Sequence, residues 1–221
     1  MKRAQHRAYG YLQCPERVKD CIQQWAEKSF GWKIEKNWIT IMNGVCLFIY
    51  FLLALRFHPH IGISVALCIN TFSHPGDGIV VLSPIYYPLT NLSEDNGRVV
   101  HRSSLIFNPT THRYEIDWDD FEAKLALPRT KIYINCSPHN PSRRLWPREE
   151  LLRIGQLCLK HPVITVSDEI HWDFALPIKD EHGSERRHVP IASISPEIAA
   201  NTSFSLQLFT LLFCLFVPNL P

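Results

Sequence analysis

Two apolar, β-rich runs flank one amphipathic segment, and this arrangement limits the fold more than any other part of the sequence. The runs are KIYINC (131–136) and PVITVS (162–167), and each is apolar on both faces, as in parallel strands that are covered on two sides. The segment between them has one apolar stripe at helical spacing, made of Leu151, Ile154, Leu157 and Cys158. Pro147 fits the first turn of this helix and Pro162 ends it. The sequence therefore predicts a β-α-β unit.

Further elements of the same kind precede this unit. GIVVLS (78–83) and GRVVHRS (97–103) read as strands, and residues 63–72 and 117–127 read as helices. Asp117 is a plausible N-cap for the second helix. Strands that alternate with helices predict an α/β fold with three αβα layers around a mostly parallel sheet.

Polar and aromatic side chains follow three of the predicted strands. Tyr86 comes after 78–83, Asn140 after 131–136, and Asp168 with His171 after 162–167. Ligands of open parallel sheets bind beyond the carboxyl ends of the strands, so we expect these residues to converge. Tyr86 could stack on a flat ring, Asp168 could pair with a ring N–H, and Asn140 could bond a ring oxygen. Taken singly, these residues could instead be a core aromatic, a helix cap and a turn.

Composition and charge argue against several other classes of protein. The formal net charge is +2 and no basic stripe with interleaved aromatics occurs, so no nucleic-acid partner is expected. The 7 cysteines form no C-x-x-C pair, which gives no support for structural zinc and suits a reducing, cytoplasmic setting. The cluster Asp168, Glu169, His171 and Asp173 fits no common metal-ligand spacing, so no metal site is predicted.

Two apolar segments do not follow this pattern of alternating strands and amphipathic helices. Residues 45–57 and 204–221 are apolar without amphipathic spacing, and each run is shorter than the ~20 residues of a membrane-spanning helix. A buried helix or strand, a weak membrane anchor and translated non-coding sequence are the alternatives. The membrane alternative is the least favoured of them, and no membrane partner is expected.

Three stretches resemble the fold-type I pyridoxal-phosphate enzymes of the class I/II aminotransferase superfamily, and most closely their cystathionine β-lyase, or cysteine-S-conjugate β-lyase, subgroup. Residues 137–174 resemble the pattern N-P-H-N-P-x-G-R-x-W-x-x-E-E-L…V-x-S-D-E-I-H-x-D. Residues 72–89 resemble P-G-D-x-V-x-x-x-x-P-x-Y-x-P, and residues 6–39 resemble the subgroup's N-terminal stretch. The fold that this resemblance implies is the large domain of these enzymes, here incomplete.

The resemblance also implies roles for individual residues around pyridoxal 5′-phosphate (PLP). Asp168 would pair with the protonated pyridine nitrogen, Asn140 would donate to the ring's phenolic oxygen, and His171 would lie beside that oxygen. Tyr86 would stack on the ring. Tyr11 would reach the cofactor phosphate of a neighbouring subunit, which implies a homodimer. The substrates of the intact family are amino acids.

The family's Schiff-base lysine has no counterpart in this sequence. The resemblance places it about 30 residues after Asp168, but the last lysine is Lys179, in a charged loop. We therefore expect no catalytic residue set and an inactive fragment of a C–S β-lyase or aminotransferase. The alternative is a non-catalytic pseudoenzyme that pairs with a full-length relative.

The edges of the resemblance suggest four parts of the chain. They are a family-like segment (1–43), an apolar insertion (44–61), the PLP-binding part (62–202) and an apolar tail without resemblance (203–221). We hypothesise that the insertion and the tail are unspliced intron sequence, because the resemblance is lost and regained at sharp edges. A stable, translated transcript that retains codons 45–61 would contradict this.

One departure from the family pattern has a structural consequence. Arg143 stands where the pattern has glycine. Glycine is favoured where the backbone needs a positive φ, a conformation that arginine adopts less readily.

Overall fold

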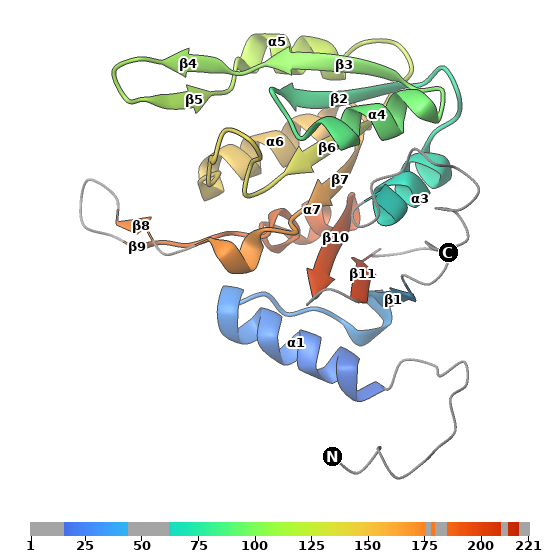
Figure 1. The fold of residues 1–221 in the computed structure, drawn as a ribbon, viewed down its shortest axis with the longest axis vertical. Helices are drawn as coiled ribbons and strands as arrows, with labels where there is room; N and C mark the ends of the chain where they lie inside the picture. Colours follow the sequence, from blue (N-terminus) through green and yellow to red (C-terminus); the bar gives the residue numbers. More distant parts are fainter. Residues whose placement is uncertain (1–15, 44–61, 176–177, 180–184, 209–211, 217–221) are drawn as a thin grey trace.

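A computed structural model describes residues 16–43, 62–175, 178–179, 185–208 and 212–216 of the chain (Figure 1). Its main sheet has seven strands in the order β1-β11-β10-β7-β6-β2-β3. Their bounds in that order are Ile39–Asn43, Leu212–Phe216, Thr202–Leu208, Ile164–Asp168, Thr130–Cys136, Gly78–Ser83 and Val99–Ser104. The pairs from β10 to β3 are parallel, whereas β11 runs antiparallel to both β10 and β1. The predicted mostly parallel sheet is confirmed.

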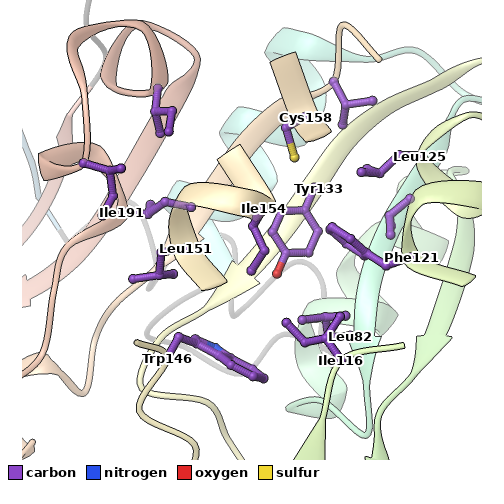
Figure 2. Close-up of a cluster of buried hydrophobic side chains, with 14 of the residues drawn as sticks. Leu82, Ile116, Phe121, Leu125, Tyr133, Trp146, Leu151, Ile154, Cys158 and Ile191 are labelled. Carbon is purple, nitrogen blue, oxygen red and sulfur yellow. The ribbon is translucent and has the colours of Figure 1, made fainter. Parts of the chain in front are cut away.

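One face of the sheet is covered by α5 (Trp118–Leu125), α6 (Arg148–Lys160) and α7 (Pro196–Ala200). Phe121 of α5 and Ile154 of α6 meet Tyr133 of β6 in the centre of this core, where the Phe121 and Tyr133 rings lie edge to face at 5.0 Å (Figure 2). Val80 and Leu82 of β2 point to the same side. The amphipathic stripe of α6 is thus the face that packs on the sheet, as its spacing predicts.

The opposite face is covered by α3 (Gly62–Phe72) and α4 (Tyr87–Asp95). Ile79 and Val81, which alternate with Val80 and Leu82 along β2, pack here against Val65 of α3. Both faces of β2 are therefore buried, which explains its uninterrupted apolar sequence. Helices on both faces give the three αβα layers predicted from the sequence.

A third, smaller core joins the N-terminal helix α1 (Glu16–Phe30) to the end of the sheet that carries β1. Its aromatic centre is Trp172, which lies 4.2 Å from the Trp25 ring and stacks on Phe30 at 4.7 Å. Trp172 belongs to the short 3-10 helix η3 (Trp172–Phe174), which follows β7. The segment just after the β7 end is therefore fixed by packing.

The remaining elements are short. They are the 3-10 helices η2 (Lys36–Trp38) and η4 (Ile191–Ser193), and the hairpins β4 (Ile106–Asn108) with β5 (Arg113–Glu115) and β8 (Ile178–Lys179) with β9 (Glu185–Arg186). Figure 1 shows both hairpins projecting from the main sheet.

The boundaries differ from the sequence predictions by one or two residues at several places, and two of these differences lie next to the predicted site. Pro147 is the N-cap of α6 and does not lie in its first turn, because the helix begins at Arg148. β7 begins at Ile164 and includes Asp168, so this residue ends the strand instead of following it. The predicted cap Asp117 is confirmed by the bond from the Asp120 N–H to its Oδ1 at 3.1 Å.

The apolar segments fall partly outside the described residues. Residues 44–61, the proposed insertion, lie outside them entirely. Within the proposed tail and just before it, β10 pairs with β7 and β11 pairs with β10 and β1, so the backbone adopts the strand alternative there. The proposed division of the chain into four parts stays a prediction. Within the described part, no helix is both long and apolar enough to cross a membrane.

Candidate functional site

The carboxyl ends of β2, β6 and β7 are tied together by hydrogen bonds. Cys136 is in register with Asp168, and the next N–H, that of Ser137, donates to the Asp168 carbonyl at 3.0 Å. The His139 Nε2 lies 3.3 Å from the Leu82 carbonyl near the end of β2. The structure therefore brings the three strand ends to one edge of the sheet, as the parallel topology predicts.

Asp168 is a buried acid without a cationic partner in the described part of the chain. Its side chain accepts a hydrogen bond from the Ile170 N–H at 3.2 Å, and the residue is only 2% exposed. Burial, with a smaller effect of the neighbouring Glu169 charge, raises its pKa to about 7 although the hydrogen bond from the Ile170 N–H acts in the opposite direction. A carboxyl group in this state favours a protonated nitrogen beside it, because the added positive charge stabilises the carboxylate form.

Tyr86 occupies the N-cap position of α4 and is half-buried. Burial raises the pKa of its hydroxyl, and the charges of Tyr87 and Asp168 act in the same direction. The influence of Asp168 places these two residues within electrostatic reach of each other. An aromatic ring and a buried carboxyl group therefore lie at the same strand edge.

Asn140 belongs to a loop that is held in place by its neighbour His139. The His139 Nδ1 lies 2.7 Å from the Ser142 hydroxyl, so the ring joins this loop to β2 through its two nitrogens. Burial lowers the pKa of His139 to about 4, and it is neutral at pH 7. A neutral imidazole can donate to the Leu82 carbonyl from Nε2 and accept from Ser142 at Nδ1. Sequence reasoning missed this role of His139.

Trp146 and Arg144 anchor the far end of the loop. The Trp146 Nε1–H donates to the Cys136 carbonyl at 2.9 Å, and the fully buried indole packs edge-on against His139. The Arg144 guanidinium lies over the indole, 4.7 Å from its centre, and forms an ion pair with Glu150. Asn140 is therefore carried by a loop that is bound at both ends.

Arg143 does adopt the conformation that the family pattern reserves for glycine. Its φ is +57°, and its N–H donates to the His139 carbonyl at 2.8 Å, so the turn is imposed by the loop. A non-glycine residue in this region costs about 1–2 kcal/mol. The substitution of glycine by arginine has therefore not changed the sign of φ at this position.

Replacing Arg143 by glycine should stabilise the fold, because glycine adopts this backbone conformation without a Cβ penalty. We expect a gain of about 1 kcal/mol in the free energy of unfolding, measured by urea denaturation. Glycine at Arg113, an exposed β5 residue, is the matched control and should give no gain. No gain at Arg143 would mean that the turn is not strained.

An open pocket of about 570 Å³ lies beside Asn140 and His171. Its lining includes Pro138, Asn140, Arg143, Leu145, His171 and Phe174. His171 is half-buried, and burial lowers its pKa, which favours the neutral ring. The pocket thus combines apolar walls with an amide, the imidazoles of His139 and His171, and one guanidinium.

A second set of residues behind the strand edge was missed by sequence reasoning. Glu169 is fully buried, with its Oε2 2.5 Å from the His188 Nε2 and its Oε1 2.8 Å from the Ser167 hydroxyl. The Ile191 N–H also donates to this Oε1, at 3.2 Å. From the sequence, Glu169 stands out only as a member of the acid and histidine cluster 168–173. Its neighbours in the sequence gave no sign that its partner stands 19 residues away.

Other predicted features fall elsewhere. Tyr11 lies outside the described residues, so its role and the implied homodimer stay predictions. Lys179 lies in β8, which pairs with β9 in the hairpin that projects from the main sheet in Figure 1. Over the described residues, no three His, Cys, Asp or Glu side chains gather as they would around a metal ion.

The fold agrees with comparisons to known proteins. Residues 62–205 match the family described as aminotransferase class I and II, and the chain belongs to this family. It is 35% identical to cystathionine beta-lyase PatB of Bacillus subtilis (strain 168) over 90% of its own length and 45% of that of PatB. It is 31% identical to protein MalY of Escherichia coli (strain K12) over 62% of this chain and 33% of MalY. The family resemblance drawn from the sequence is confirmed.

Solved structures show the same architecture. A PLP-bound putative aminotransferase from Clostridium difficile 630 is similar at a TM-score of 0.81 and 28% identity, over 99% of this chain and 51% of that one. A PLP-bound C-S lyase from Staphylococcus hominis shares the fold at a TM-score of 0.80 and 22% identity. The chain spans about half the length of such structures and less than half of PatB and MalY.

Proposed function

We propose that this 221-residue chain binds PLP reversibly at the strand edge and does not itself catalyse C–S cleavage or amino transfer. The observation that carries the proposal is Asp168, a buried carboxyl group at a strand end without a cation beside it in the described part. The membership in a PLP-dependent family and the position of Tyr86, Asn140 and His171 around the same edge support it.

Each residue would hold the cofactor through a different group. The Asp168 carboxylate would accept from the ring N–H, and the Tyr86 ring would stack on the cofactor face. Asn140 and His171, on the two loops beside the pocket, would contact the ring oxygen. When bound, PLP supplies an electron sink for reactions at the α-carbon of an amino acid.

The positions of the lysines support the non-covalent part of this proposal. Residues 180–221 contain no lysine. Lys179 lies in β8, which among the described strands pairs only with β9 and is not part of the main sheet. Activated lysines are buried or lie beside other cations, which lowers their pKa. Without such a lysine, the cofactor would be held by contacts alone and would leave on dialysis.

The test is an absorbance titration of the purified chain with PLP, followed by borohydride reduction and peptide mass spectrometry. We expect a saturable spectral change that dialysis reverses, and no PLP adduct that is specific to one lysine. The Asp168→Asn variant should lose the spectral change, whereas Asp95→Asn, an exposed acid on α4, should keep it. A stoichiometric reduced adduct on Lys179 would contradict the non-catalytic proposal.

The absence of any saturable absorbance change at millimolar PLP would contradict the binding proposal as well.

Addition of a full-length relative distinguishes the pseudoenzyme alternative from an inactive fragment. Co-elution of the two chains, with PLP bound only in the mixture, would favour the pseudoenzyme.

A further inference from the structure

His139 joins the loop that carries Asn140 to the strand that leads to Tyr86. Its Nε2 lies 3.3 Å from the carbonyl of Leu82 on β2, and its Nδ1 lies 2.7 Å from the hydroxyl of Ser142 in the loop. The residue is only 2% exposed. One buried imidazole therefore connects two of the segments that contribute to the proposed PLP site.

The backbone of His139 is held as firmly as its ring. Its N–H donates to the Arg144 carbonyl at 2.8 Å, and its carbonyl accepts from the Arg143 N–H at 2.8 Å. The Trp146 indole lies edge-on to the imidazole, with 5.3 Å between the ring centres. These contacts fix the backbone at the point where Asn140 begins.

The carboxamide of Asn140 depends on this backbone for its direction. The residue is half-buried, and its backbone N–H lies 3.5 Å from the Cys136 sulfur. Within the part of the chain that the structure describes, the carboxamide itself forms no hydrogen bond. It is therefore available to a ligand, and the residue that sets its direction is His139.

The two side-chain contacts of His139 require a neutral ring with its hydrogen on Nε2. The Leu82 carbonyl can only accept, so Nε2 donates, and Nδ1 then accepts from the Ser142 hydroxyl. Burial lowers the pKa of His139 to about 4, and the Arg144 charge acts in the same direction, although the Leu82 carbonyl opposes them. The ring is therefore neutral at pH 7, as both contacts demand.

We propose that His139 is a positioning residue that directs the Asn140 carboxamide at the ring oxygen of bound PLP. The inference rests on the proposed function and adds to it a residue that does not touch the cofactor. Because His139 acts through Asn140, its loss should weaken the contact to the ring oxygen. The contact of Asp168, which belongs to β7, should remain.

Two stable probes isolate the ring oxygen. Pyridoxine 5′-phosphate and 3-deoxypyridoxine 5′-phosphate differ only by that oxygen, and neither has an aldehyde that could react with a lysine. Calorimetric titration of the wild-type chain should show the first probe binding about 10-fold tighter, the scale of one hydrogen bond to a charged group. His139→Phe removes both nitrogen contacts and should reduce this preference to within about 2-fold, with the affinity for the deoxy probe unchanged.

A conservative variant keeps the test independent of whether His139→Phe folds. His139→Gln can still donate to the Leu82 carbonyl but cannot satisfy Ser142 in the same way, so it should retain a preference of about 3-fold. His112→Phe, at an exposed position between β4 and β5, is the matched control and should retain the whole preference.

A double variant tests whether His139 acts through Asn140. Asn140→Ala alone should abolish the preference for the ring oxygen. Addition of His139→Gln to it should change neither affinity further, because the carboxamide that His139 positions is already absent.

The outcomes separate this inference from the proposed function. A full preference in both His139 variants would overturn the positioning role and leave cofactor binding standing. Equal losses of affinity for the two probes would also overturn it, because His139 would then support only the fold. Equal affinity of the wild type for both probes would do the same. Failure of both probes to bind the wild-type chain would overturn the cofactor proposal and this inference together.

Discussion

Replacing Asp168 by asparagine should make the chain more stable at pH 8 while it loses affinity for PLP. Burial raises the pKa of this carboxyl group from 3.8 to about 7, so the folded chain retains a proton that the unfolded chain releases. The stability that the protonated form contributes is present below pH 4 and is lost as the pH rises towards 7. At 1.36 kcal/mol per pKa unit, the loss amounts to about 4 kcal/mol.

Asparagine has nearly the shape of the acid, and its side-chain oxygen can still accept from the Ile170 N–H. We therefore expect Asp168→Asn to exceed the wild type by about 2–4 kcal/mol at pH 8 and to equal it near pH 4. Urea denaturation at pH 4, 6 and 8 measures this difference, with exposed Asp95→Asn as the control that should show none. Equal pH dependence in Asp168→Asn and the wild type would show that Asp168 does not titrate as described.

The loss of function in the same variant has the same origin. A neutral amide cannot balance a protonated ring nitrogen, so the affinity for PLP should fall more than about 10-fold, or 1.4 kcal/mol. Opposite signs for stability and affinity are typical of groups retained for binding at the expense of folding. A variant that loses both stability and affinity would instead mark Asp168 as a structural residue.

Replacing Glu169 by alanine should have the largest destabilising effect, about 3–5 kcal/mol. The change removes the acceptor for His188, for the Ser167 hydroxyl and for the Ile191 N–H. These three donors belong to buried residues. A buried polar group that loses its hydrogen-bond partner destabilises the fold by its full cost of desolvation.

The double variant Glu169→Leu/His188→Phe tests whether this loss arises because His188 is left buried without a hydrogen-bond acceptor. Since an apolar pair leaves no buried charge, we expect it to recover at least half of the stability lost in Glu169→Ala. Chemical denaturation of the single and double variants gives the coupling energy between the two positions, expected above about 2 kcal/mol. The exposed pair of Glu27 and Lys33 provides the control, where Glu27→Ala should cost under about 1 kcal/mol.

A loss below about 1 kcal/mol in Glu169→Ala would contradict this account of the buried network. Recovery in stability without recovery of PLP affinity would show that the network also positions the neighbouring Asp168. That distinction separates a purely structural role from a supporting role in the site.

Local patterns were sufficient to predict the central part of the fold. The stripe of α6 and the two-sided apolar runs of β6 and β7 depend on periodicities of a few residues, and the structure reproduces them. The edge formed by β1, β11 and β10 was not predicted as a sheet. β10 and β11 come almost entirely from the apolar segment 204–221, which has no amphipathic spacing, so its sequence does not fix the partners or the direction of these strands.

The location of the candidate site could be predicted from the sequence, because it depends on the parallel arrangement of the strands. The rule that parallel strands share one carboxyl edge was enough to predict that the strand ends next to Tyr86, Asn140 and Asp168 are neighbours. The contacts of His139 and the pairing of Glu169 with His188 depend on loop conformations and on residues distant in the sequence. No local pattern encodes these contacts, and they became apparent only in the structure.

The most direct test of the central claim is a crystal structure of the chain with PLP. We predict the ring against Tyr86, its nitrogen within hydrogen-bond distance of the Asp168 carboxylate and its phenolic oxygen facing Asn140, without a bond to any lysine. Cofactor bound elsewhere, or joined covalently to Lys179, would contradict the assignment of the strand edge as a non-covalent PLP site.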